Sequence, residues 1–146
     1  MTGFEKLLLA VDNGPQAELL INRVSELYQS SLAKLDVVHV VKQGLHDAEL
    51  LRADLCRTPH AQRVDDHLAI KIREMLRRNG LAINSDKIHL VRGDPAFEIK
   101  KLAKVLDSDL VIVGSHCHGN DWLSLPGATT NCVIQGISSD VMAVRI

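Results

Sequence analysis

The sequence predicts an α/β protein that folds as a single doubly wound domain over residues 1–146, with a five-stranded parallel sheet covered by helices on both faces. Three observations predict this class. The chain has 146 residues, of which 46% are hydrophobic and 24% charged, which is typical of one globular domain with a substantial core. Short apolar runs rich in Val, Ile and Leu recur along the chain. The segments between them have a helical period.

The apolar runs predict five strands. They are apolar almost without interruption, which is typical of strands that are buried on both faces in a parallel sheet. Because ligands of open parallel sheets bind at the carboxyl ends of the strands, the loops that follow these runs are candidate sites. The runs are KLLLAV at 6–11, KLDVVHVV at 34–41, KIHLV at 87–91, DLVIVG at 109–114 and DVMAVRI at 140–146.

Two helices are predicted in the first half of the chain. The first opens at NGPQAE, where Asn13 or Gly14 can cap the helix and Pro15 suits its first position. The second covers about 60–79 and ends at Gly80, which can adopt a left-handed backbone conformation. The expected inward faces are Leu20, Ile21, Val24, Leu27 and Tyr28 in the first helix and Val64, Leu68, Ile72, Met75 and Leu76 in the second.

Two more helices are predicted in the second half. Asp94 is the expected N-cap of the third, with Pro95 behind it, and the fourth begins near Gly127. Residues 42–59 stay undecided, since they suit a short helix within a long surface connection, and such connections often form lids. The expected inward faces are Ala96, Ile99, Ala103 and Leu106 in the third helix and Val133, Ile134 and Ile137 in the fourth.

Composition and charge exclude several classes of function. A formal net charge of −1 and 3% aromatic residues provide neither a field that attracts polyanions nor surfaces for stacking bases, so we expect no nucleic acid partner. The longest apolar run is only as long as a strand, and no cleavage site follows the first run, so we expect no membrane contact and no signal peptide. Three scattered cysteines fit reduced thiols, and we expect a cytoplasmic protein.

The segment VGSHCHGNDWLSLPGATTN at 113–131 is the first candidate for chemistry. It predicts a strand that ends at Gly114, a loop over 115–126 and a helix from about Gly127. The backbone N–H groups of residues 127–130 lack helical partners and should point toward the crevice, where they would stabilise an anion. Thr129 and Thr130 can add hydroxyl donors, and Gly127 allows a phosphate to approach the main chain closely.

Gly114 and Gly127 match the outer glycines of Gly-x2-Gly-x9-Gly-Ser/Thr, the nucleotide-binding signature of the universal stress protein family. KLLLAVD at the start, VVHVV, RGDP before the third helix and DVMAVRI at the end extend the likeness, so the whole chain resembles that family. The resemblance implies a fold like that of the adenine nucleotide alpha hydrolases, a homodimer and a role in the stress response. In one branch of the family it implies bound ATP, or AMP or ADP, with Mg²⁺ if ATP is bound.

The resemblance also implies roles for individual residues. Asp12 resembles the acid that contacts the ribose or the metal-bound phosphates, and Val40 resembles the hydrophobic neighbour of the adenine. The other positions resemble a phosphate loop whose contacts are mostly main-chain. The implied nucleotide site consists of Asp12, Val40, Gly114, Cys117, Gly127, Ala128, Thr129 and Thr130.

Two of these positions depart from the family pattern. Cys117 stands where the second glycine is expected, and its side chain crowds the approach of a phosphate. Ala128 stands where Ser or Thr is expected and removes a hydroxyl donor. A hydrogen bond to a charged group contributes about 1.5–3 kcal/mol, so its loss would weaken binding by about an order of magnitude or more without abolishing it.

Other interpretations of these residues stay open. Asp12 could simply cap the turn before the first helix, and Gly114 and Gly127 could serve only strand exit and helix entry. The other branch of the family dimerises without nucleotide, and the protein would then be an interaction module. We expect a homodimer through the last strand, Val141–Ile146, whose free edge a twofold mate would pair. We do not expect an enzyme, although slow ATP hydrolysis by the same site stays open.

The triplet His116-Cys117-His118 suggests a metal ligand set or a reactive thiol. No second set of cysteines and histidines supplies further ligands, so we predict no metal site. A thiol next to two histidines and a helix N-terminus could react with oxidants, but an inert loop cysteine is the simpler interpretation. GSHCHG also lacks the final glycine of a hydrolase Gly-x-Ser-x-Gly turn, so we predict no catalytic residue.

Overall fold

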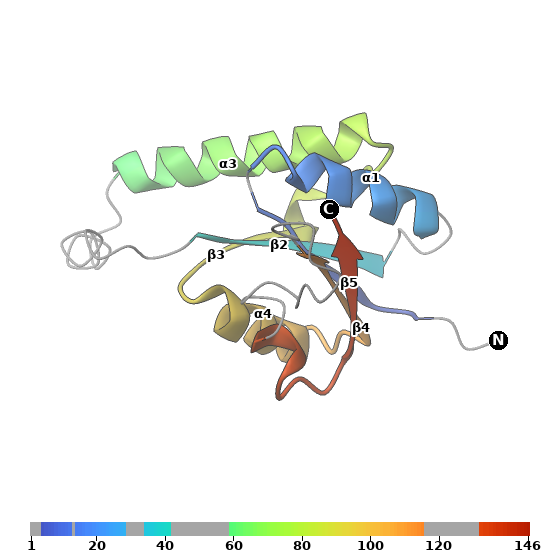
Figure 1. The fold of residues 1–146 in the computed structure, drawn as a ribbon. Helices are drawn as coiled ribbons and strands as arrows, with labels where there is room; N and C mark the ends of the chain where they lie inside the picture. The colour runs from blue at the N-terminus through green and yellow to red at the C-terminus, as the bar shows by residue number, and fades with distance from the viewer. Residues whose placement is uncertain (1–3, 13, 29–33, 42–58, 116–131) are drawn as a thin grey trace, which may run out of the picture.

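The computed structural model describes residues 4–12, 14–28, 34–41, 59–115 and 132–146 (Figure 1). Within them, five parallel strands form one sheet in the order β3-β2-β1-β4-β5. This confirms the predicted sheet, and each strand begins and ends within one residue of its apolar run. The strands are β1 (Leu7–Ala10), β2 (Leu35–Val41), β3 (Ile88–Arg92), β4 (Leu110–Ser115) and β5 (Asp140–Arg145).

Helices cover both faces of the sheet, as predicted (Figure 1). The helices α1 (Ala17–Leu27) and α3 (Pro59–Arg78) lie on one face, and α4 (Pro95–Val105) lies on the other. A 3-10 turn, η2 (Ser85–Lys87), leads into β3. Residues 132–134 are helical and lie on the α4 side. In the described part of the chain, no helix is both long enough and apolar enough to span a bilayer.

Each face of the sheet has its own apolar core. Leu7 and Leu9 of β1 pack with α1 and α3, whereas Leu8, between them, packs with α4 and Val133. Successive residues of a strand point to opposite faces, so a central strand that is covered on both sides must be apolar at every position. This is the physical reason why the strands read as continuous apolar runs.

Where side chains are described, the predicted inward faces of the helices are largely confirmed, with two corrections; the side chain of Val64 lies outside the described residues. Leu27 is 59% exposed, because the buried face of α1 is turned toward Ala17 and Ser25, two small residues that let the helix approach the sheet closely. Ile134 is 45% exposed, although Val133 is fully buried. Neighbouring helical residues point about 100° apart, so one short turn of helix buries only one of them well.

The start of the first helix also differs from the prediction. α1 begins at Ala17 rather than at Pro15, and the side chain of its N-cap residue, Gln16, makes no capping hydrogen bond. A turn precedes it instead, in which the carbonyl of Gly14 accepts the N–H of Ala17 at 3.1 Å. The carboxylate of Asp12 accepts the N–H of Gly14 at 2.9 Å. The chain therefore makes a separate turn between β1 and α1.

The other predicted helix ends are confirmed. The carboxylate of Asp94 accepts the N–H of Phe97 at 2.9 Å, and Pro95 is the first residue of α4. Gly80 follows α3 with a φ of 85°, a conformation that glycine adopts without steric cost. Residues 42–58, and the predicted loop and helix start at 116–131, lie outside the described residues.

Candidate functional site

The order of the strands places a candidate site at the carboxyl ends of β1 and β4. β1 lies at the centre, β2 and β3 follow on one side of it, and the chain then crosses to β4 on the other side. The connections that follow β1 and β4 therefore run in opposite directions, and in open α/β sheets such a reversal is where a crevice forms at the carboxyl ends of the strands. Ligands of open α/β sheets bind at such a reversal of strand order. Asp12 stands on one side of this reversal and Ser115, the last residue of β4, on the other.

Asp12 lies two residues beyond the end of β1, and its side chain is exposed. One of its carboxylate oxygens accepts the N–H of Gly14 at 2.9 Å, so it does cap the turn before α1. This bond orients a carboxylate at the carboxyl end of β1, where the strand order reverses. A capping role and a ligand role are therefore compatible, since the same bond that closes the turn fixes the direction of the side chain.

Val40 provides an apolar surface at the same edge of the sheet, on the strand next to β1. It is the penultimate residue of β2, pairs in register with Val91 of β3, and is partly buried against the α4-side core. β2 is the neighbour of β1, so Val40 lies close to the strand that leads into Asp12. A half-buried valine and an exposed carboxylate at the same edge suit a ligand that has both an apolar part and hydrogen-bond donors.

Gly114 lies within β4 rather than at its end, since the strand continues to Ser115. A Cβ atom added to Gly114 would lie 2.8 Å from Cδ1 of Ile146 and 3.4 Å from Cδ2 of Leu20. The φ of Gly114 is not in the left-handed region. The lack of a side chain thus has a structural reason that needs no ligand, namely the packing of α1 and the chain after β5 against β4.

The remaining predicted positions lie outside the described residues. These are Cys117, Gly127, Ala128, Thr129 and Thr130, together with Asn13. The structure therefore brings Asp12, Val40 and Gly114 to the carboxyl edge of the sheet. Of these, Asp12 and Val40 are the positions that the resemblance implies for the ribose and the adenine, and Gly114 belongs to the implied phosphate loop.

His39 is a residue of this edge that the sequence analysis did not single out. It is only 6% exposed, and its Nδ1 lies 2.9 Å from the carbonyl oxygen of Val11. The only signal in the sequence is a lone histidine in the apolar run VVHVV. That signal does not reveal the partner, because the partner depends on how β1 and β2 pair in space.

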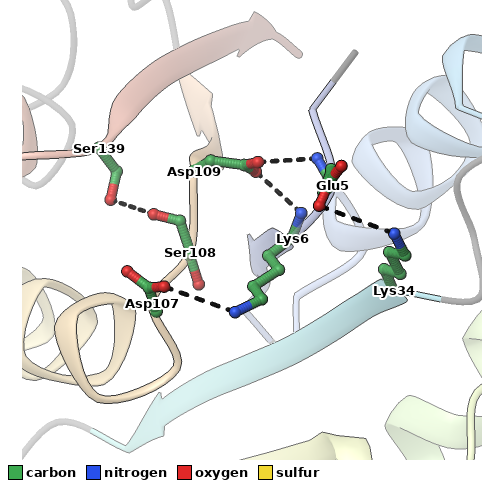
Figure 2. A network of polar contacts seen from close by, with 7 residues as sticks. All are labelled: Glu5, Lys6, Lys34, Asp107, Ser108, Asp109 and Ser139. Carbon is green, nitrogen blue, oxygen red and sulfur yellow. Dashed lines mark hydrogen bonds and ion pairs between the residues drawn. The ribbon is translucent and has the colours of Figure 1, made fainter. Parts of the chain in front are cut away.

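A second polar region lies at the opposite, amino-terminal edge of the sheet (Figure 2). The carboxylate of Asp109 accepts the backbone N–H groups of Glu5 and Lys6 at 2.7 and 2.9 Å. The side chain of Lys6 reaches Asp107 at 3.5 Å. These contacts join the start of β1 to the start of β4. A shallow cavity of about 430 Å³ lies between these residues and 138–140.

The polar groups of this amino-terminal region are engaged with one another. Burial acts to raise the pKa of Asp109, but the hydrogen bonds from the backbone N–H groups of Glu5 and Lys6 outweigh it and lower that pKa. Ser139 donates its hydroxyl to the carbonyl of Ser108 at 2.6 Å. Among the described residues, no group of His, Cys, Asp or Glu has the arrangement of a metal site. We therefore interpret this region as a structural clamp on β1.

The comparisons with known proteins agree with this architecture. The chain is 30% identical over 153 residues to Universal stress protein A homolog 2 of Coxiella burnetii, covering 100% of this chain and 98% of that one. A solved structure of the hypothetical protein MJ0577 has a TM-score of 0.69 and 21% identity, and the match covers 99% of this chain and 98% of that one. These values show a shared fold over the full length of the relatives.

Two further solved structures of this fold contain adenine nucleotides. One is a universal stress protein in complex with cAMP, with a TM-score of 0.59, 19% identity and 98% of each chain covered. The other is the universal stress protein of Archaeoglobus fulgidus in complex with dAMP, with a TM-score of 0.59, 16% identity, and 97% of this chain and 98% of that one covered. The model of the universal stress protein family matches residues 3–145. On this match over nearly its whole length, the chain belongs to the universal stress protein family.

Proposed function

We propose that this protein is a cytoplasmic regulatory module of the stress response that binds an adenine nucleotide at the carboxyl ends of β1, β2 and β4. The observation that carries the proposal is the reversal of strand order between Asp12 and the exit of β4. The cAMP and dAMP held by structures of the same fold support an adenine nucleotide as the class of ligand.

In this proposal, Asp12 and Val40 would meet the ribose and the base of such a ligand. Adenine would pack beside Val40, whose side chain is only partly buried. The exposed carboxylate of Asp12 would accept hydrogen bonds from the ribose hydroxyls or face the metal-bound phosphates. If ATP is bound, Mg²⁺ would neutralise its phosphates, and carboxylate oxygens are ligands that suit this ion. The phosphates would be held by the backbone N–H groups of 127–130, with Thr129 and Thr130 as further donors.

Equilibrium binding of ATP, ADP, AMP and cAMP, measured by titration calorimetry with and without Mg²⁺, tests the proposal. The variant Asp12→Asn tests the role of the charge, because asparagine can keep the turn by accepting the N–H of Gly14 but carries no charge. We expect it to weaken binding by about tenfold or more, since a bond to a charged acceptor is lost. Absence of binding by the unmodified protein for every nucleotide would refute the proposal.

The two departures from the family pattern make a second prediction. Replacing Cys117→Gly and Ala128→Ser together restores the phosphate loop of the family, so the double variant should bind ATP about tenfold more tightly. The affinity for adenosine, which has no phosphates, should not change. Equal gains for both ligands, or no gain for either, would contradict our account of the loop.

A homodimer that acts as an interaction module is the alternative function. β5 pairs only with β4 in the described sheet, so its outer edge presents backbone groups that a twofold mate could pair. The side chains of Val141, Val144 and Ile146 pack against the core of their own chain, so such an interface would rely on the backbone edge more than on these residues. Native mass spectrometry reports subunit number and copurified nucleotide together, and a nucleotide-free dimer would favour this alternative.

We propose binding rather than catalysis, and we assign no catalytic residue. Slow hydrolysis of ATP by the same site would require steady-state release of phosphate that Asp12→Ala abolishes. Release that persists in that variant would indicate a contaminating activity rather than this site.

A further inference from the structure

His39 is the one buried titratable side chain among the residues that the structure describes. It stands on β2 between Val38 and Val40, both of which face α4, so its own side chain faces α1 and α3. The other buried strand residues that face α1 and α3 are apolar. A polar group there needs a hydrogen-bonding partner, because burial without one is costly. The partner is the carbonyl of Val11, at 2.9 Å.

The partner determines the state of the ring. A backbone carbonyl can only accept a hydrogen bond, so the proton must be on Nδ1 of His39, which acts as the donor. In the neutral ring this leaves the lone pair on Nε2. Of the two neutral tautomers, only the one with its proton on Nδ1 can make this bond. The bond fixes the orientation of the ring relative to the carbonyl of Val11.

Val11 is thereby tied to β2 by both of its backbone groups. Its N–H donates to the carbonyl of Val38 at 2.9 Å, and its carbonyl accepts from His39. Val11 lies one residue beyond β1 and is 6% exposed, and the next residue is Asp12. These two bonds therefore determine the point and the direction at which the chain leaves the sheet toward the candidate site.

We propose that His39 is a positioning residue of the nucleotide site: it holds the exit of β1 so that Asp12 meets the ribose or the metal-bound phosphates while Val40 meets the adenine. This inference rests on the proposed function, because it concerns the same site. The side chain of His39 is buried on the α1 and α3 side of the sheet, so it would act on the ligand only through Val11. The carbonyl of Val11 is thus bonded to a side chain of β2 rather than to its backbone. This bond couples β1 and β2, the two strands that carry Asp12 and Val40 at their ends.

Two substitutions separate the hydrogen bond from the packing. His39→Leu fills the buried position but has no donor. His39→Asn carries an amide nitrogen near the place of Nδ1 and keeps a donor for the carbonyl of Val11. The control is His89→Leu, which removes the other well-bonded histidine of the sheet, paired with Asp36 at 2.8 Å.

Two measurements are made on each variant of the full chain. The first is the affinity for ATP and AMP. The second is the hydrogen exchange rate of the Val11 amide, which donates to Val38, against that of Leu81, which donates to Leu76 at 2.9 Å at the end of α3. The exchange measurement needs no nucleotide. It distinguishes a local opening at the β1 exit from a general loss of stability, which would speed both amides alike.

We expect His39→Leu to bind nucleotide about tenfold more weakly and to exchange faster at Val11 but not at Leu81. His39→Asn should recover most of the affinity, and His89→Leu should lose stability without losing affinity. An unchanged affinity in His39→Leu, or equal acceleration of the two amides, would overturn the positioning role. If the unmodified protein binds no nucleotide, the proposed function fails instead, and exchange at Val11 still decides whether His39 holds the exit of β1.

Discussion

Replacing Gly114 by alanine tests why β4 carries a glycine near its carboxyl end. The new Cβ would lie 2.8 Å from Cδ1 of Ile146, closer than carbon atoms pack in proteins, and 3.4 Å from Cδ2 of Leu20. The backbone of Gly114 is not left-handed, so alanine causes no conformational strain of its own. The cost is therefore one of space, and it falls mainly on the terminal methyl group of Ile146.

The size of the effect follows from two opposing contributions. Overpacking a core position costs about 1–3 kcal/mol, and the movable end of Ile146 places this case at the lower end. Alanine also restricts the unfolded chain, which stabilises the protein by about 0.4–1 kcal/mol. We expect a small net loss of about 0.5 kcal/mol in the free energy of unfolding, or about 1–2 °C in Tm.

The matched partner variant is Ile146→Val, which removes Cδ1 and little else. Alone it should cost about 0.5–1.5 kcal/mol, the usual range for this change. In Gly114→Ala/Ile146→Val the new Cβ occupies the space of the lost methyl group, so the double variant should be more stable than the sum of the single changes predicts, by about 1 kcal/mol. Urea unfolding of the four proteins measures this coupling. Strict additivity would refute the packing explanation for Gly114.

The same set of proteins addresses the role that the family resemblance implies for Gly114. If the glycine serves only packing, the double variant regains stability and also binds nucleotide as the unmodified protein does. If the glycine also makes room for phosphate, the double variant regains stability but stays weak in binding ATP. Comparing ATP with adenosine assigns any loss to the phosphates.

Two other predictions concern stability. The pKa of Asp109 is lowered in the folded protein, so its charge stabilises the fold above the unfolded pKa of about 3.9, and this contribution is lost as the pH falls through the lower folded value. Asp109→Asn should therefore be less stable at pH 7, and urea unfolding should show the difference shrinking in acid; a constant difference would contradict this. Asp94→Ala removes the cap of α4 and should cost about 1 kcal/mol by thermal unfolding, whereas Asp94→Ser should cost much less.

The strands and most helix faces could be predicted because their signals are local. Continuous apolar runs indicate a sheet covered on both faces, and Asp94 followed by Pro95 indicates the start of α4 whatever the rest of the chain does. The exposure of Leu27 could not be predicted in this way. The spacing of Leu20, Val24 and Leu27 is compatible with one apolar face, but the small residues of α1 decide which side of the helix approaches the sheet.

In the candidate site, too, the features that local signals encode could be predicted and those that depend on distant partners could not. Asp12 and Val40 stand at the ends of predicted strands, so the topology alone brings them to one edge. The partner of His39 and the neighbour of Gly114 lie far away in the sequence, at Val11 and Ile146. Their roles depend on strand register and on what packs above the sheet. A glycine that matches a phosphate-binding pattern thus turned out to have a packing partner that the pattern does not encode.

β1 is short, yet side chains from neighbouring strands hold it at both ends. At its start, Asp109 accepts two consecutive N–H groups, and beyond its end His39 donates to Val11. Between them, Leu7, Leu8 and Leu9 are buried almost completely. Because a strand held in this way has little freedom left to lose, a ligand at Asp12 pays little of the ordering cost that a flexible site would impose. The proposed nucleotide-binding edge would then owe part of its affinity to residues that never touch the ligand.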